Sequence, residues 1–226
     1  MHPKYKLNAE LGWKVHDHLV KLGLETPMTE GVKDTAERKI ASITDSFSDI
    51  MIDLGLDLTD DSLCDTPSRV AKMYVNEIFY GLDYNKFPKC TAIENKMSHN
   101  GSFVLEKNIN VQSNCEHHFV VIDGLCTIAY LPGKKVLGLS KLNRIVQFFA
   151  KRPQVQERLT EQIRATIQFV SESEDVAVYV DAKHWCVKSR GIQDQTSSTV
   201  TLSVGGVFAT ENSEIRKEFL NLARSG

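Results

Sequence analysis

The chain has 226 residues, of which 42% are hydrophobic and 25% are charged, and its formal net charge is −2. This length allows one large domain, or a small domain beside a main one, and the composition is that of an ordinary globular protein. The nearly balanced charge argues against nucleic-acid or membrane-surface binding, so any anion site has to be a local basic cluster.

We expect a cytoplasmic protein. Residues 1–11 lack the charged and then apolar pattern of a leader, and we find no apolar run long enough to span a membrane. Five cysteines, at spacings unlike a disulfide framework, favour a reducing compartment. Three of them, Cys64, Cys90 and Cys126, have no polar cluster beside them and are predicted to be small buried apolar residues.

Helices are predicted in the first third of the chain. Apolar residues at helical spacing favour a helix between Leu7 and Leu22. Its histidines, His16 and His18, are not expected to bind metal, because no thiol or carboxylate pattern supports them.

Two further helices follow. Asp34 or Thr35 can cap the first, which runs to about Leu54 and carries one apolar stripe for the core or for another subunit. The second begins at Thr66-Pro67, because proline is favoured in a first helical turn.

The hydrophobic period changes to two from Ser102 onward. Residues 103–111 alternate as a half-buried strand should. Residues 119–131 continue as strand, turn and strand, with Asp123-Gly124 as the predicted hairpin turn. The polar group Asn114–Phe119 therefore lies where one strand gives way to another.

The second half alternates between the two patterns. Helices are predicted to open at Leu139, with Ser140 as cap, and at Pro153. The predicted later elements are a strand at 176–181, sheet extensions at 185–189 and 199–208, and a last helix at 214–224 capped by Ser213. This order predicts an α+β fold with an antiparallel sheet.

Two clusters of metal-binding residue types stand far apart in the sequence. Cys115 and His118 are three residues apart, and Cys186 follows much later. A Cys2His set is typical of catalytic zinc, which keeps a fourth position for water. The alternative is a structural zinc closed by a fourth ligand, for which Glu116, His117 or His184 would be available.

His117 and His184 each neighbour a predicted ligand and point away from it if the backbone is extended. Imidazoles near neutral pKa suit proton delivery to a leaving nitrogen. The alternative is that both merely support the metal ligands.

Basic residues flank the two clusters. A helix N-terminus already favours anions, so phosphate is the ligand predicted for these residues. Each of them alone could equally lie on a solvated face. They are Lys141, Arg144, Lys188 and Arg190, with Ser140 beside them and with Arg69 and Lys72 on the third helix.

Glu157 could accept two parallel hydrogen bonds from the ring NH and exocyclic amine of guanine, although a solvent-facing helix glutamate is the alternative.

Taken together, these segments resemble the GTP cyclohydrolase I family. The resemblance runs from about Thr35 to Leu222 and is strong from Asp65 onward. The matching motifs are Asp65–Lys72, Cys115–Phe119, Gly138–Gln147, Arg152–Leu159 and His184–Gly191.

The resemblance implies a tunnelling fold (T-fold), with residues 1–64 as an N-terminal helical region and 65–226 as the catalytic domain. It implies a toroidal homodecamer of two pentamers, with active sites between subunits. The expected reaction converts GTP and water to formate and 7,8-dihydroneopterin triphosphate, the entry to folate or tetrahydrobiopterin synthesis, and allosteric control is an open possibility.

The resemblance also assigns chemistry to residues. Cys115, His118 and Cys186 match the zinc ligands, whose ion activates the water that attacks carbon 8 of the guanine ring. His117 would protonate nitrogen 7 as the ring opens, and His184 would assist formate release.

The remaining matches concern the substrate. Gln156 and Glu157 match the pair that reads the base, and Ser140 would assist ribose opening. The triphosphate would be bound by Lys141, Arg144, Arg190, Arg69 and Lys72. The competing hypotheses are a nucleotide-binding protein with a structural zinc and no turnover, and a related T-fold enzyme, which would lack this combination of motifs.

Overall fold

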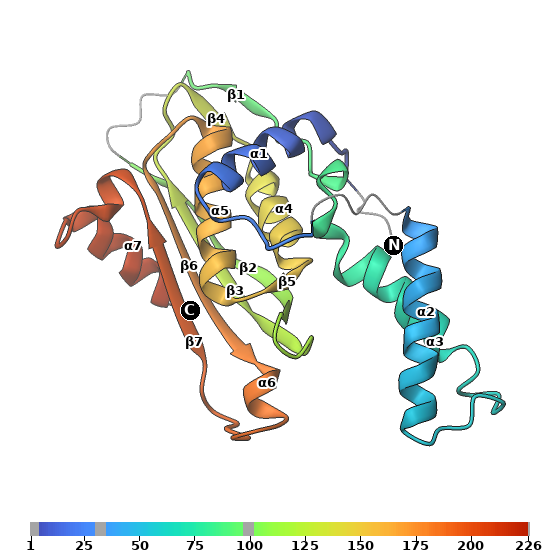
Figure 1. Ribbon diagram of the computed structural model, residues 1–226. Helices are drawn as coiled ribbons and strands as arrows, with labels where there is room; N and C mark the ends of the chain where they lie inside the picture. Colours follow the sequence, from blue (N-terminus) through green and yellow to red (C-terminus); the bar gives the residue numbers. More distant parts are fainter. Residues whose placement is uncertain (1–4, 30–34, 97–101, 226) are drawn as a thin grey trace.

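The computed structural model of the protein describes residues 5–29, 35–96 and 102–225. Its centre is a five-stranded sheet with the order β5-β2-β3-β6-β7 (Figure 1). Neighbouring strands are antiparallel except at one edge, where β5 runs parallel to β2. The strands are β2 (Val104–Cys115), β3 (Val121–Tyr130), β5 (Pro153–Gln154), β6 (Val176–His184) and β7 (Thr199–Val204). The predicted α+β class is confirmed.

One face of the sheet is covered by α4 (Leu139–Ala150) and α5 (Gln156–Ser171), with α1 (Ala9–Lys21) outside them (Figure 1). Alternate strand residues such as Val111 and Ile122 are fully buried against these helices. The period of two in the sequence does not mark one face throughout: Ile109 and Val111 face the main core, whereas Phe103 and Leu105 pack on the opposite face, because the register of β2 shifts between Glu106 and Ile109.

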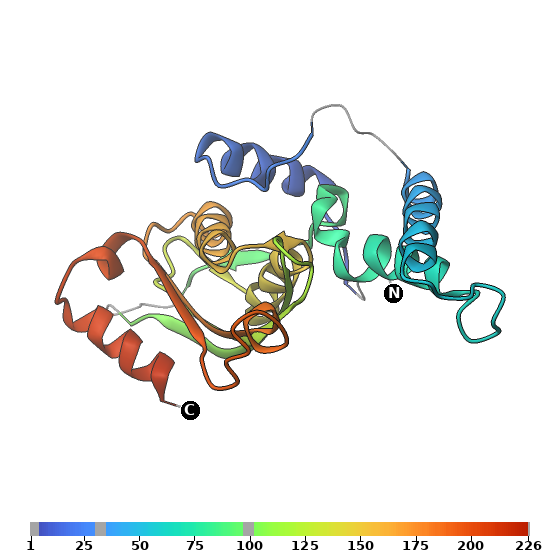
Figure 2. The same ribbon diagram turned by 60° about the horizontal axis from the view of Figure 1, so that its bottom comes forward.

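The other face carries a smaller cluster under the last helix. Phe208, in the short helix η4 (Gly206–Ala209), packs with Phe219 of α7 (Glu214–Arg224) against Ala177 and Tyr179. Figure 2 shows α7 on the side of the sheet opposite α4 and α5. As predicted, Ser213 caps α7 by accepting from the amide of Arg216.

Two helices, α2 (Ala36–Asp53) and α3 (Thr66–Met73), pack on each other and project away from the sheet (Figure 2). Thr35 caps α2; the alternative cap, Asp34, lies outside the described residues. Of the apolar stripe on α2, Met51 is buried, whereas Ile50 and Leu54 are 50% and 72% exposed. Ile40, Ile43 and Phe47 are partly buried, so it is the C-terminal end of the stripe, at Ile50 and Leu54, that is left exposed.

Short elements join these parts. Helix α3 continues as a π-helix, η1 (Tyr74–Ile78), and then as two 3-10 turns, η2 (Tyr80–Leu82) and η3 (Tyr84–Lys86). A separate two-stranded sheet pairs β1 (Ala92–Glu94) with β4 (Lys135–Leu137). Among the described residues, no helix combines the length and apolar character needed to cross a membrane. Helix α1 packs on α5 and η3, so the division of the chain at residue 64 remains a prediction.

The predicted turn at Asp123-Gly124 is wrong, because β3 continues through both residues. A Cβ atom on Gly124 would collide with the carbonyl oxygen of Asp181 on β6. The glycine thus permits close approach of two strands. The turn between β2 and β3 is instead formed by Glu116–Phe119, where Phe119 adopts a left-handed φ of 54°.

Three other boundaries were mispredicted. The sheet extension predicted at 199–208 ends at Val204, where β7 gives way to the 3-10 helix η4. Residues 185–188 form a short helix, α6 (Trp185–Lys188), instead of a strand. At its end the Ser189 amide donates to the Trp185 carbonyl at 2.8 Å. Pro153 does not begin a helix, because Gln154 pairs with Cys115 at the sheet edge and the helix begins only at Gln156. The pairing of β5 with β2, which joins residues far apart in the sequence, is what delays the start of α5.

Local features also differ from prediction. Gly138, not Ser140, occupies the cap position of α4. Cys126 is fully buried as predicted and Cys90 partly so, but Cys64 is exposed in the loop after α2.

Candidate metal centre and its surroundings

The turn Glu116–Phe119 is held tightly at the end of the β2–β3 hairpin. The Cys115 amide donates to the Val120 carbonyl, and the Phe119 amide donates to the Cys115 carbonyl, both at 2.8 Å. Asn114 adds a side-chain bond to the Phe119 carbonyl at 3.1 Å. The Phe119 ring packs edge-on against Phe79, with centroids 5.2 Å apart. These contacts fix where Cys115 and His118 can point.

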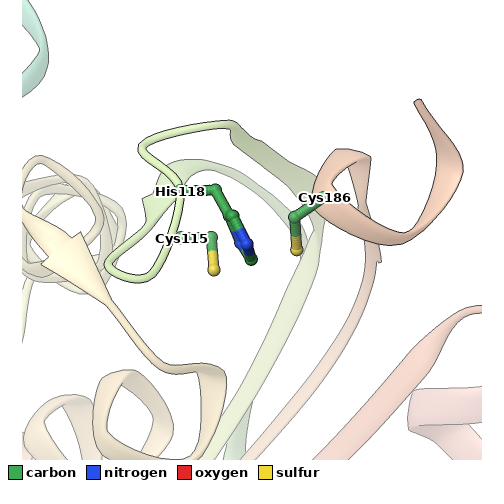
Figure 3. Close-up of side chains that lie close together, drawn as sticks. All are labelled: Cys115, His118 and Cys186. Carbon is green, nitrogen blue, oxygen red and sulfur yellow. The ribbon is translucent and has the colours of Figure 1, made fainter. Parts of the chain in front are cut away.

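Cys186 reaches the turn from the neighbouring strand. The register pairs Ile122 of β3 with His184 of β6, so β6 ends beside the turn and α6 follows there. The ligand atoms of Cys115, His118 and Cys186 lie within 4.8 Å of one another, and Figure 3 shows the three side chains converging. The metal group predicted from the sequence is thus assembled within one chain.

The donor set fits zinc. Two thiolates and one imidazole match the ligands of catalytic zinc sites that keep one open position. Within residues 5–29, 35–96 and 102–225, no fourth Cys, His, Asp or Glu joins this group. Burial, followed by the neighbouring Cys115 thiol, raises the pKa of Cys186. A bound dication would favour the thiolates instead.

Two of the three suggested fourth ligands, Glu116 and His184, have partners outside the metal group. Glu116 forms a two-pronged ion pair with Arg158, at 2.6 and 3.3 Å. His184 Nε2 lies 2.7 Å from Gln156 Oε1. His117 is exposed, with Nδ1 3.6 Å from the Cys115 sulfur.

His184 and Glu157 lie near each other at the metal group. Burial lowers the pKa of His184, and the Glu157 carboxylate opposes that effect. Glu157 is exposed at the start of α5, free to meet a ligand, whereas Gln156 is 1% exposed. The structure therefore brings two histidines, His117 and His184, and the start of α5 to the metal group. Of the two α5 residues, Gln156 is buried and Glu157 is exposed.

Basic residues divide into two sets. Arg190 donates to Nε2 of His118 at 2.6 Å, and Lys188 lies over the Trp185 ring, so both are beside the metal group. Arg69 and Lys72 are exposed on α3, where Arg69 pairs with Asp65 at 3.1 Å.

Ser140, Lys141 and Arg144 lie far from the metal group, in the first turns of α4. Asn143 of the same segment bonds Glu106 near the start of β2, at 3.0 Å. A strand rises about 3.3 Å per residue, so the path from Glu106 to Cys115 spans about 30 Å. The Arg144 guanidinium lies over the Tyr5 ring, 5.2 Å from its centroid.

Sequence reasoning missed two arginines. Arg158 anchors the turn through Glu116, and its position beside Glu157 in the same motif was the available signal. Arg152 is fully buried and pairs with Glu25 at 3.1 Å, with the rings of Phe148, Phe149 and Tyr84 around it. No local pattern marks a buried arginine.

Comparison with known proteins agrees with these features. A profile described as GTP cyclohydrolase I matches residues 43–224. Relatives named GTP cyclohydrolase 1 include one from Shewanella denitrificans, 56% identical over 211 residues that cover 93% of this chain and 96% of the relative. One from Mannheimia succiniciproducens is 56% identical over 209 residues, 92% and 94% of the two chains. One from Shewanella baltica is 54% identical over 216 residues, 96% and 99%.

Proposed function

This chain belongs to the GTP cyclohydrolase I family, and from that premise we propose residue roles for its site. The protein is an enzyme that converts GTP and water to formate and 7,8-dihydroneopterin triphosphate. The convergence of Cys115, His118 and Cys186 within 4.8 Å, beside two further imidazoles, supports placing the reaction there.

Cys115, His118 and Cys186 would hold a zinc ion. Such an ion lowers the pKa of a bound water molecule toward neutrality and so supplies the nucleophile for carbon 8 of guanine. The absence of a fourth protein ligand, within the described part of the chain, leaves a position for that water.

His117 and His184 are proposed to move protons. The exposed ring of His117, beside the Cys115 sulfur, would donate to nitrogen 7 as the bond from carbon 8 breaks. His184, whose pKa is lowered by burial, would assist the second hydrolysis that releases formate.

Glu157 is proposed to read the guanine edge, because its carboxylate is exposed beside His184 and can accept from the ring NH and the exocyclic amine. Ser140 would assist ribose opening. Triphosphate would be bound by Arg190 from the same end of the sheet, together with Lys141, Arg144, Arg69 and Lys72.

The separation of these residues supports a site shared between copies. Lys141 and Arg144 are too far from the metal group to meet one GTP molecule within a single chain. A toroidal homodecamer of two pentamers would supply them from a neighbouring copy, would pair free sheet edges such as β7, and would cover the apolar stripe of α2. We place this enzyme in the cytoplasm, feeding folate or tetrahydrobiopterin synthesis.

The decisive experiment is formate release from GTP, with neopterin fluorescence after oxidation and dephosphorylation. We expect zinc-loaded protein to release formate, a chelator to stop it, and added zinc to restore it. His117→Ala should keep zinc and lose ring opening. Absence of formate from zinc-loaded protein would contradict the activity, and loss of zinc in His117→Ala would contradict the proton-donor role.

A further inference from the structure

The side-chain amide of Gln156 has only one possible orientation. The two hydrogens of its Nε2 are shared among three acceptors: the carbonyl oxygens of Thr199 at 2.8 Å and Val180 at 3.2 Å, and the Thr201 hydroxyl at 3.2 Å. Backbone carbonyls only accept hydrogen bonds, so a flipped amide would set oxygen against oxygen. With Gln156 1% exposed, water cannot relieve that repulsion.

This orientation determines which atom meets His184. Gln156 Oε1 lies 2.7 Å from His184 Nε2, and an amide oxygen can only accept. His184 Nε2 must therefore carry a hydrogen, and in the neutral ring Nδ1 is the nitrogen with the free lone pair. Gln156 thus sets both the direction of the ring and its tautomer.

Two threonine hydroxyls, of Thr160 and Thr201, form hydrogen bonds with Gln156 on the side away from His184. Thr160 Oγ1 donates to the main-chain carbonyl oxygen of Gln156 at 2.7 Å and is 2.6 Å from Thr201 Oγ1. Since the only proton of Thr160 is already donated, Thr201 has to donate to Thr160 while it accepts from Gln156. The chain of hydrogen bonds runs from β7, at the sheet edge, through Gln156 to His184.

We propose that Gln156 and Thr201 are positioning residues for His184, and that Gln156 does not contact the guanine base. The resemblance assigned Gln156 to base reading beside Glu157, but its buried amide is committed to β6, β7 and His184. This inference rests on the proposed role of His184 in the reaction.

The test compares Gln156→Met with Glu157→Gln on GTP and on inosine triphosphate, which lacks the exocyclic amine. We expect Gln156→Met to lower kcat about 10- to 100-fold, as is typical when a residue that orients a functional histidine is removed. Its KM for GTP and its preference for GTP over inosine triphosphate should stay as in the wild type. Glu157→Gln should lose that preference.

A raised KM together with a lost preference in Gln156→Met would overturn the proposal while leaving the cyclohydrolase activity intact. No formate from the wild type would instead contradict the activity itself. The two failures are therefore distinguishable.

Thr201 provides the milder variant, should Gln156→Met fold poorly. Thr201→Val should lower kcat severalfold at unchanged KM, and Thr201→Ser, which keeps the hydroxyl, should restore it. The matched control is Thr166→Val on α5, where the buried hydroxyl has no hydrogen-bond partner among the residues that the structure describes. Equal kcat in Thr201→Val and wild type, or equal losses in Thr201→Ser and Thr201→Val, would overturn the role of Thr201.

Discussion

The two ends of the sheet differ in how much of the proposed site one chain supplies. The metal end, where β2, β3 and β6 meet, brings Cys115, His118 and Cys186 within 4.8 Å. The basic end, formed by the first turns of α4, carries Lys141 and Arg144 about a strand length away. Strand register assembles the metal end within a single chain, whereas we propose that the basic end acts on GTP bound at the metal end of another copy. Four experiments test this comparison.

The largest effect is expected at the metal end. Cys186→Ala should lose zinc and reduce formate release to background. The far-ultraviolet circular dichroism should stay as in the wild type, because Cys186 is only partly buried at the margin of a large apolar core. Cys64→Ala is the matched control, since that thiol is exposed and does not belong to the metal group. An unfolded Cys186→Ala would mean that the metal is structural.

Mixing variants tests whether the two ends belong to different copies. Cys115→Ala and Lys141→Ala should each be inactive alone. After subunit exchange in equal amounts, about a quarter of shared sites would combine an intact metal end with an intact basic end, if copies mix at random. Formate release should therefore reappear.

The control is each variant exchanged with itself, and mass spectrometry verifies mixing. Mixed assemblies without activity would show that one chain supplies both ends.

The buried pair Arg152–Glu25 tests what supports the metal end. Arg152 precedes β5, whose Gln154 pairs with Cys115, and Glu25 joins it from the segment after α1. Arg152→Met leaves the partly buried Glu25 carboxylate without a cation, with the Tyr84 hydroxyl still donating to it, so the free energy of unfolding should fall by about 3–5 kcal/mol. Urea denaturation measures the change.

Arg69→Met is the control, because the Arg69–Asp65 pair is exposed and should contribute less than about 1 kcal/mol. A similar small loss for Arg152→Met would mean that the packed rings around it accept methionine equally well.

The smallest expected effect is a difference in thiol alkylation between the two ends of the sheet. Cys90 lies near Lys141 and Arg144, and burial raises its pKa to about 12, although both cations oppose the shift. At pH 8 its thiolate fraction is on the order of one in ten thousand, so iodoacetamide should spare it. Exposed Cys64 should react.

A chelator should add Cys115 and Cys186 to the alkylated set without changing Cys90, as peptide mass spectrometry can show. Labelling of Cys115 and Cys186 that is the same with and without chelator would indicate that no metal protects them.

The sequence by itself determined the elements and the chemistry of this protein. Helical spacing located α1, α2 and α5, the period of two located β2, and the Cys115, His118 and Cys186 residue types were enough to indicate zinc. These features are local, because spacing along the chain and side-chain chemistry do not depend on distant partners.

Only the tertiary structure decided how those residues are used. Gly124 belongs to a strand because β6 lies against it, and Gln156 faces His184 because β6 and β7 offer its amide only acceptors. Register and burial join residues that are far apart in sequence, so no local pattern contains them. The same long-range pairing leaves Lys141 at one end of the sheet and the metal group at the other.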